Sequence, residues 1–235
     1  MSLLTRLLHI CGSSSFLVAI YYDIFILDLP EDISPTREKF GGHFKYLTFL
    51  NMCLQFLFFT NCIFADFSAE NSRICKLRDI VFASAAFPIG IFVGVIFWSL
   101  WAIDRELIFS VRFDGFFPAW LNHFMHTTVL PLQLGELYLC RHEYPSRKVG
   151  MSITAALTMG YLVWLNVIYY KAGFWVYPVF KVLSPSARPI FMIFCCALGA
   201  VFYFLGETMT NAFWPKLTVV AGGETGRKTR KSRRD

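Results

Sequence analysis

The sequence predicts an all-α fold: a bundle of six transmembrane helices with both termini in the cytosol. Of its 235 residues, 56% are hydrophobic and only 16% are charged, whereas about a quarter of the residues of a soluble domain are charged. The mean hydropathy is +0.51. Six separate stretches approach the roughly 20 apolar residues that a membrane-spanning helix needs. This composition excludes a soluble enzyme, a disordered chain and a secreted domain held together by disulfides.

Short polar connections that carry turn signals separate the six apolar stretches. The predicted spans cover residues 7–27, 45–66, 80–103, 117–140, 150–170 and 190–211. None of the connections is long enough to hold a second domain, so we expect one membrane domain over residues 1–214. Residues 215–235 are rich in Gly, Thr, Lys and Arg, which predicts a basic, disordered cytosolic tail.

Basic residues set the orientation. Fourteen Lys and Arg residues fall on the side that holds both termini and eight on the other, so the positive-inside rule places the termini in the cytosol. The basic run at 227–234 can contact anionic lipid headgroups at about 1 kcal/mol per residue, or act only as a topology signal. We expect membrane lipids as partners. Nucleic acid is a poor fit for a tail attached to a membrane bundle.

Two of the predicted spans carry polar stripes. The second span holds three polar residues within an arc of about 60°: Thr48, Asn51 and Gln55. The fourth span holds four polar residues within about 100°: Asn122, His123, His126 and Gln133. Pro131 removes a backbone donor and predicts a kink in the same helix. Because polar groups are costly in a membrane and usually face the bundle interior, we predict an internal polar site between these two helices.

The residue types in the two stripes allow one kind of chemistry. A histidine can act as a general base, and a Thr hydroxyl becomes a nucleophile when a base takes its proton. Thr48 and His126 are therefore a candidate pair, although both residue types more often make structural hydrogen bonds in membrane helices. On straight helices the two would lie at depths of about 5 and 14 Å. Tilt can remove that difference, so the depths leave both interpretations open.

A metal site is not expected from these patterns. His123 and His126 offer two ligands on one helix with no carboxylate nearby, and the remaining histidines, His9, His43 and His142, lie in other segments. The seven cysteines form no CxxC pair, which argues against a zinc site and a disulfide framework. We expect neither a metal nor another cofactor.

Several short motifs, in order from about residue 5 to 215, resemble the family of androgen-induced and androgen-dependent tissue-factor-pathway-inhibitor-regulating proteins. The motifs are Phe44-Lys45-Tyr46-Leu47-Thr48, Leu77-Arg78-Asp79, Ala86-Phe87-Pro88, Asp104-Arg105-Glu106-Leu107-Ile108, Trp120-Leu121-Asn122-His123 with Met125-His126-Thr127, Tyr144-Pro145-Ser146, and Trp175-Val176-Tyr177-Pro178-Val179-Phe180. Each motif alone is weak, and together they are specific.

The resemblance implies an integral-membrane threonine hydrolase that cleaves fatty acid esters of hydroxy fatty acids. The resemblance maps the catalytic Thr onto Thr48 and the catalytic His onto His126. It also implies that the protein lies in the endoplasmic reticulum or the plasma membrane. For the oxyanion of such a reaction we consider Lys45, Asn51 and Asn122 as donors. His123 either orients His126 or makes a structural hydrogen bond.

Two positions depart from the family pattern. His43-Phe44 stands where the family pattern leads us to expect an Arg-Trp pair, and Phe124 stands where a small residue is expected. The acyl pocket can therefore differ in shape from that of the relatives. A substrate carboxylate would meet Lys45 or Arg105, unless these are only interfacial charges. The alternative function is a lipid-binding or regulatory membrane protein without catalysis. The oligomeric state is not predicted.

Overall fold

The computed structural model describes residues 2–30 and 39–215, and within these ranges the fold is all-α, as predicted. The helices are α1 (Leu3–Phe25), α2 (Leu47–Asp66), α3 (Arg73–Val81), α4 (Phe87–Ile103), α5 (Ala119–His123), α6 (Val129–Leu139), α7 (Arg147–Ala172), α8 (Val179–Val182) and α9 (Ala187–Phe213). Apart from Pro215, the predicted tail at 215–235 lies outside the described residues.

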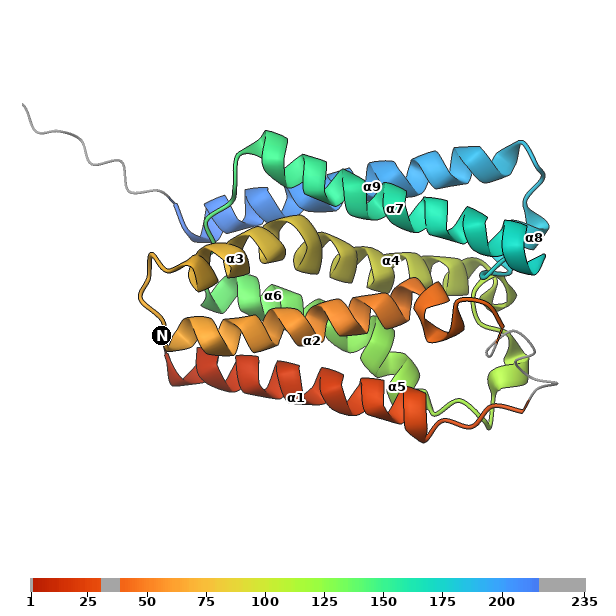
Figure 1. The fold of residues 1–235 in the computed structure, drawn as a ribbon, viewed down its shortest axis with the longest axis horizontal. Helices are drawn as coiled ribbons and strands as arrows, with labels where there is room; N and C mark the ends of the chain where they lie inside the picture. Colours follow the sequence, from red (N-terminus) through yellow and green to blue (C-terminus); the bar gives the residue numbers. More distant parts are fainter. Residues whose placement is uncertain (1, 31–38, 216–235) are drawn as a thin grey trace, which may run out of the picture.

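The long helices lie side by side along one axis, and the chain passes from one end of the bundle to the other repeatedly (Figure 1). The N-terminus and the end of α9 lie at the same end of the bundle. Five helices are long and apolar enough to cross a membrane: Leu3–Phe25, Leu47–Asp66, Arg73–Ile103, Arg147–Ala172 and Ala187–Phe213. These correspond to five of the six predicted spans.

The remaining predicted span, 117–140, is divided. Its helical part consists of the short helix α5, a π-helical turn at Phe124–Thr128, and α6, and it passes obliquely behind α2 (Figure 1). This segment is not among the five apolar helices, because it carries the histidines and amides of the predicted polar stripe. The six-span count and the cytosolic orientation of the termini therefore stay predictions.

A second π-helical turn, Phe82–Ala86, joins α3 to α4 into one helical rod. Pro88 follows this turn, and because proline has no N–H it cannot bond the carbonyl of Ser84, four residues earlier. The hydroxyl of Thr154 on α7 donates to that carbonyl instead, at 2.8 Å. Pro131 has the same relation to the π-helical turn at Phe124–Thr128. The proline kink predicted in the fourth span is thus accompanied by a widened helical turn just before the proline.

The core is built largely from aromatic rings. The rings of Phe16, Phe58, Phe59, Phe82 and Phe87 are almost completely buried and belong to one cluster shared by α1, α2 and the α3–α4 rod. Many large apolar side chains of α1, α7 and α9 are exposed on the outside of the bundle, as expected for helices that face lipid. The exposed outer surface and the buried aromatic core agree with an integral membrane protein.

Helices α7 and α9 approach closely at Gly150, which predicts a specific stability defect. A Cβ at this position would lie 2.6 Å from Cε2 of Tyr203, whereas a Cβ at Gly160, on the same helix, would meet nothing within 4 Å. Gly150→Ala should therefore destabilise the protein by about 1–3 kcal/mol through overpacking, while Gly160→Ala should be neutral or stabilising. Thermal unfolding in detergent, followed by the reactivity of the buried cysteines, measures the difference. Equal melting temperatures for the two variants would contradict this packing.

Candidate active site

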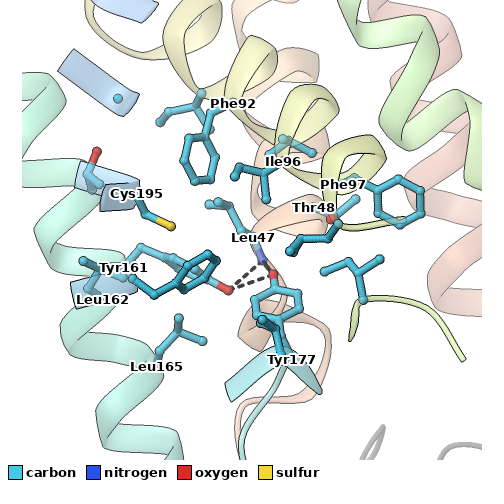
Figure 2. A pocket seen from close by; sticks show the side chains of 18 of the residues that line it. Leu47, Thr48, Phe92, Ile96, Phe97, Tyr161, Leu162, Leu165, Tyr177 and Cys195 are labelled. Atoms are coloured by element: carbon cyan, nitrogen blue, oxygen red, sulfur yellow. Dashed lines mark hydrogen bonds between the residues drawn. The ribbon is translucent and has the colours of Figure 1, made fainter. Parts of the chain in front are cut away.

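Thr48 lies in the first turn of α2, and that turn is held by two tyrosines from elsewhere in the chain. The main-chain N–H of Leu47 donates to the hydroxyl of Tyr161 on α7 at 3.0 Å and to that of Tyr177 at 2.9 Å. The Tyr161 hydroxyl in turn donates to the carbonyl of Lys45 at 3.0 Å. Figure 2 shows the two tyrosine hydroxyls converging on the start of α2. Burial raises the pKa of Tyr177 to about 12, so its hydroxyl keeps its proton at neutral pH.

His126 lies in the π-helical turn between α5 and α6 and is buried. Its Nδ1 is 2.9 Å from both the main-chain oxygen and the side-chain Oδ1 of Asn122. The ring of Phe97 stacks on the imidazole, with the ring centroids 3.5 Å apart and the planes inclined by 10°. Gly94 lets the α4 backbone approach this turn, because a Cβ there would lie 2.8 Å from the His126 carbonyl oxygen. The imidazole is thus fixed in both position and ring plane.

The Thr48 hydroxyl and the His126 imidazole meet. Thr48 Oγ1 lies 3.2 Å from His126 Nε2. The main-chain oxygen of Asn122 can only accept a hydrogen bond, so Nδ1 is the ring nitrogen that carries the proton. Nε2 is then free to accept a proton from Thr48, which is the arrangement that a general base requires.

The estimated difference in depth between the two residues is absent. Helix α2 begins at Leu47, which leaves Thr48 at its very end. The α5–α6 segment runs obliquely to α2 (Figure 1), and its π-helical turn faces the start of α2. The depth estimate assumed straight helices of equal tilt. The oblique α5–α6 segment does not meet that assumption, and the two side chains are in contact.

Two cavities meet at Thr48. The first is lined mainly by apolar side chains of α4, α7 and α9 (Figure 2). The second opens between the start of α2, the π-helical turn of His126 and the connections 105–117 and 175–181. Four residues line both cavities: Thr48, Phe97, Ile108 and Tyr177. A molecule with two apolar branches can therefore place its branch point beside the Thr48 hydroxyl.

The second cavity contains polar groups that the first lacks. Asp23 and His43 line it and share a hydrogen bond of 2.8 Å, and the exposed Lys181 stands in its wall. Arg105, one of the residues considered for a substrate carboxylate, instead binds both oxygens of Asp114 at 3.0 and 2.7 Å. This guanidinium lowers the pKa of the Asp114 carboxyl. Among the residues that the structure describes, Lys181 is thus the lysine or arginine whose side chain lines this cavity.

The other predicted site residues lie around the pair rather than in the cavities. Lys45 is fully buried and lines neither cavity, and the same holds for Asn51, whose Oδ1 accepts a hydrogen bond from Gln55 at 3.0 Å. Asn122 binds His126. His123 is exposed, stacks on Trp98 and lies 3.2 Å from the Thr127 hydroxyl, and it lines neither cavity.

The polar stripe of the fourth span also enters the helix packing away from the pair. Gln133 donates to Gln55 at 2.5 Å, and Gln55 donates to the carbonyl of Ala86 at 2.9 Å. These amides join α2, α6 and the π-helical turn at Phe82–Ala86. The ring of Phe124 packs edge-on against Phe16 at 5.0 Å and lines neither cavity.

Tyr161 and Tyr177 were not predicted as part of the site. Tyr177 stands in the motif Trp175–Phe180, which signals the family but not a contact with α2. Tyr161 lies in an apolar span at a position that resembles an ordinary lipid-facing residue. Only the fold shows that both hydroxyls hold the turn that carries Thr48.

The family model for FAR-17a/AIG1-like proteins matches residues 7–211 of this chain. The chain belongs to that family. It is 37% identical to the human androgen-induced gene 1 protein over 193 residues, which is 77% of this chain and 81% of the relative. It is also 37% identical to the mouse androgen-dependent TFPI-regulating protein over 210 residues, 85% of this chain and 91% of the relative.

A more distant relative is the fission yeast UPF0641 membrane protein, 27% identical over 158 residues, which cover 66% of this chain and 69% of the relative. No solved structure matches the chain significantly. The resemblance inferred from the short motifs is confirmed over most of the chain, and FAR-17a/AIG1-like proteins are multispanning membrane proteins.

Proposed function

We propose that this family member is an integral-membrane hydrolase that cleaves the ester bond of fatty acid esters of hydroxy fatty acids. The observation that carries the proposal is the 3.2 Å contact between Thr48 Oγ1 and His126 Nε2 at the junction of two cavities. The ester of such a substrate is a branch point between two acyl chains. Each methylene that leaves water for an apolar cavity contributes about 0.8 kcal/mol.

In the first half-reaction, His126 Nε2 takes the proton of Thr48 as Oγ1 attacks the ester carbonyl carbon. The carbon–oxygen bond to the hydroxy acid then breaks, and the proton on His126 passes to the departing oxygen. The products are a free hydroxy fatty acid and an acyl-threonine. In the second half-reaction His126 deprotonates a water molecule, which releases the fatty acid and restores the Thr48 hydroxyl.

The negative charge on the tetrahedral intermediate needs hydrogen-bond donors. The first amides of a helix have no acceptor within the helix, and the N-terminus of a helix favours negative charge. The N–H of Leu47 is engaged by the two tyrosines. We assign the oxyanion to the N–H groups of Thr48 and Phe49, in place of Lys45, Asn51 and Asn122, because both belong to the turn that carries the nucleophile.

A hydrolysis assay in membranes tests the catalytic pair. Thr48→Ala and His126→Ala should each lower turnover of a hydroxy-fatty-acid ester by about 10²–10⁴-fold, because the nucleophile or its base is missing. Thr48→Ser keeps a hydroxyl and should retain part of the activity.

The matched controls are Thr60→Ala, on the same helix but bonded to Ser13 at 2.8 Å, and His123→Ala. Both should keep turnover near that of the wild type. Covalent labelling by a fluorophosphonate probe should be lost in Thr48→Ala and kept in Thr48→Ser and Thr60→Ala. Normal turnover by a folded Thr48→Ala variant would remove Thr48 from the mechanism. Absence of turnover by the wild type itself would contradict the hydrolase and favour a lipid-binding or regulatory protein.

Asn122 is proposed as a positioning residue, and the pH dependence distinguishes this role from a purely structural one. Asn122→Leu removes one acceptor but leaves the main-chain oxygen on His126 Nδ1, so kcat should fall about tenfold with KM nearly unchanged. Asn122→Asp places a carboxylate on Nδ1, which favours the protonated imidazole. The acidic limb of its pH–rate profile should therefore move to higher pH. Identical pH profiles for wild type and Asn122→Asp would exclude the positioning role.

Lys181 is proposed to bind the free carboxylate of the substrate. Lys181→Gln should raise KM about 2–5-fold for an ester that carries a free carboxylate, the range expected for an exposed ion pair. The methyl ester of the same substrate should show no change. Lys171→Gln, an exposed lysine outside this cavity, is the control. An equal effect on the acid and the methyl ester would place the carboxylate elsewhere.

A further inference from the structure

A second buried polar cluster lies at the opposite end of the bundle from Thr48, where α1 begins and α9 ends (Figure 1). It brings together the start of α1, the ends of α2 and α6, the middle of α3 and the loop that follows α6. Its members are His9, Cys62, Asp66, Arg78, Asp79, Glu136, Cys140 and His142. The ion-paired side chains in this cluster are at most 11% exposed.

Glu136 is the centre of the cluster. Its Oε2 lies 2.9 Å from Nε2 of His9, and its Oε1 lies 2.9 Å from Nε2 of His142. The thiol of Cys62 donates to Oε1 at 3.8 Å. One donor atom each from His9, Glu136 and Cys140 lie within 4.8 Å of one another. Nitrogen, oxygen and sulfur atoms thus converge from three separate parts of the chain.

Each of the two histidines has a further carboxylate behind it. Nδ1 of His9 lies 2.8 Å from Asp66, and Nδ1 of His142 lies 3.0 Å from Asp79. Arg78 holds Asp79 through Nε at 3.0 Å and Nη2 at 2.8 Å. A histidine that binds a metal through one nitrogen usually donates its other N–H to a carboxylate or carbonyl in this way. Both rings are therefore oriented with Nε2 towards the Glu136 carboxylate.

We propose that this cluster binds a zinc ion through Nε2 of His9, Nε2 of His142, the Glu136 carboxylate and the Cys140 thiolate. Zinc bonds of 2.0–2.3 Å in a tetrahedron place the donor atoms about 3.3–3.7 Å apart. The His9–Glu136 and His142–Glu136 separations of 2.9 Å are somewhat shorter than that range, and the donor atoms of His9, Glu136 and Cys140 lie within 4.8 Å of one another. A set of imidazole, carboxylate and thiolate ligands suits Zn²⁺ better than Mg²⁺ or Ca²⁺, which prefer oxygen ligands alone.

Zinc binding changes the charge of the cluster by one unit. Asp66, Asp79 and Glu136 carry three negative charges, which Arg78 and two protonated imidazoles balance when no metal is bound. On binding, each Nε2 and the Cys140 Sγ release a proton to solvent, and the Nδ1 protons stay on the bonds to Asp66 and Asp79. Zn²⁺ replaces two of the three charges that leave, so the loaded site carries one net negative charge. Four ligands close the coordination sphere, as in structural zinc sites.

This site differs from the expectation that the chain holds no metal. That expectation rested on local spacing, and the proposed ligands share no local motif because they stand at positions 9, 136, 140 and 142. The ion would join α1 directly to the end of α6 and, through Asp66 and Asp79, to α2 and α3. Its expected role is to hold this end of the bundle closed. The inference is independent of the proposed hydrolase activity.

Metal analysis of the full-length protein, purified in detergent without chelator, tests the site. About one zinc ion per chain should be retained in the wild type. Cys140→Ser and His142→Gln should reduce the zinc content at least fivefold. Cys75→Ser changes a buried cysteine at the same end that bonds only main-chain oxygens, and His43→Gln changes a histidine of the other cavity. Both controls should keep the wild-type zinc content.

A measurement on the wild type alone covers the case in which the variants do not fold. Removal of the metal with a chelator should lower the melting temperature by several degrees, and Zn²⁺, but not Mg²⁺, should restore it. The Cys140 thiol should be protected from alkylation until the metal is removed. A wild-type protein without zinc, whose melting temperature does not respond to added Zn²⁺, would overturn the proposal and leave a cluster held by protons alone.

Discussion

A main-chain carbonyl or N–H inside this bundle needs a partner in the protein, because lipid offers none, and the paths of the helices depend on that constraint. Pro88 leaves the Ser84 carbonyl without its helical partner, and Thr154 supplies a hydroxyl to it. Gln55 joins the Ala86 carbonyl to the side chains of Asn51 and Gln133. The π-helical turns are therefore tied to neighbouring helices by specific hydrogen bonds, which fixes the angles at which those helices cross.

The same constraint explains why His126 is well placed to accept a proton. Its Nδ1 is buried and must donate, and the main-chain oxygen of Asn122 is a fixed acceptor four residues earlier. Phe97 covers one face of the ring and excludes water from it. The Nε2 atom is then the only polar group of the ring that faces the cavity and Thr48. In the proposed mechanism, Asn122 takes the orienting place that a carboxylate holds in many hydrolases.

The sequence was sufficient to predict the all-α class, the approximate positions of the long helices and the polar faces that bring Thr48 and His126 together. These follow from hydropathy and from the 100° rotation per residue, which are local properties. It was not sufficient for the π-helical turn at Phe124–Thr128 or for the oblique path of α5 and α6, because both depend on packing against α2 and α4. The convergence of His9, Glu136 and His142 could not be predicted either, since it joins residues separated by up to 133 positions with no shared motif.

Helix α2 connects the two ends of the molecule. Thr48 stands in its first turn, where main-chain N–H groups lack helical acceptors, and Asp66 is its last residue, bonded to His9. Because α2 also packs along α1 and contributes Phe58 and Phe59 to the aromatic core, it cannot shift along its axis without breaking contacts at both ends. The position of the Thr48 hydroxyl relative to His126 is therefore set by the whole length of the bundle. The proposed reaction needs the Thr48 hydroxyl at hydrogen-bond distance from its base, because a threonine is a weak nucleophile. A helix fixed at both ends holds Thr48 at that distance from His126 without a closing movement of the chain.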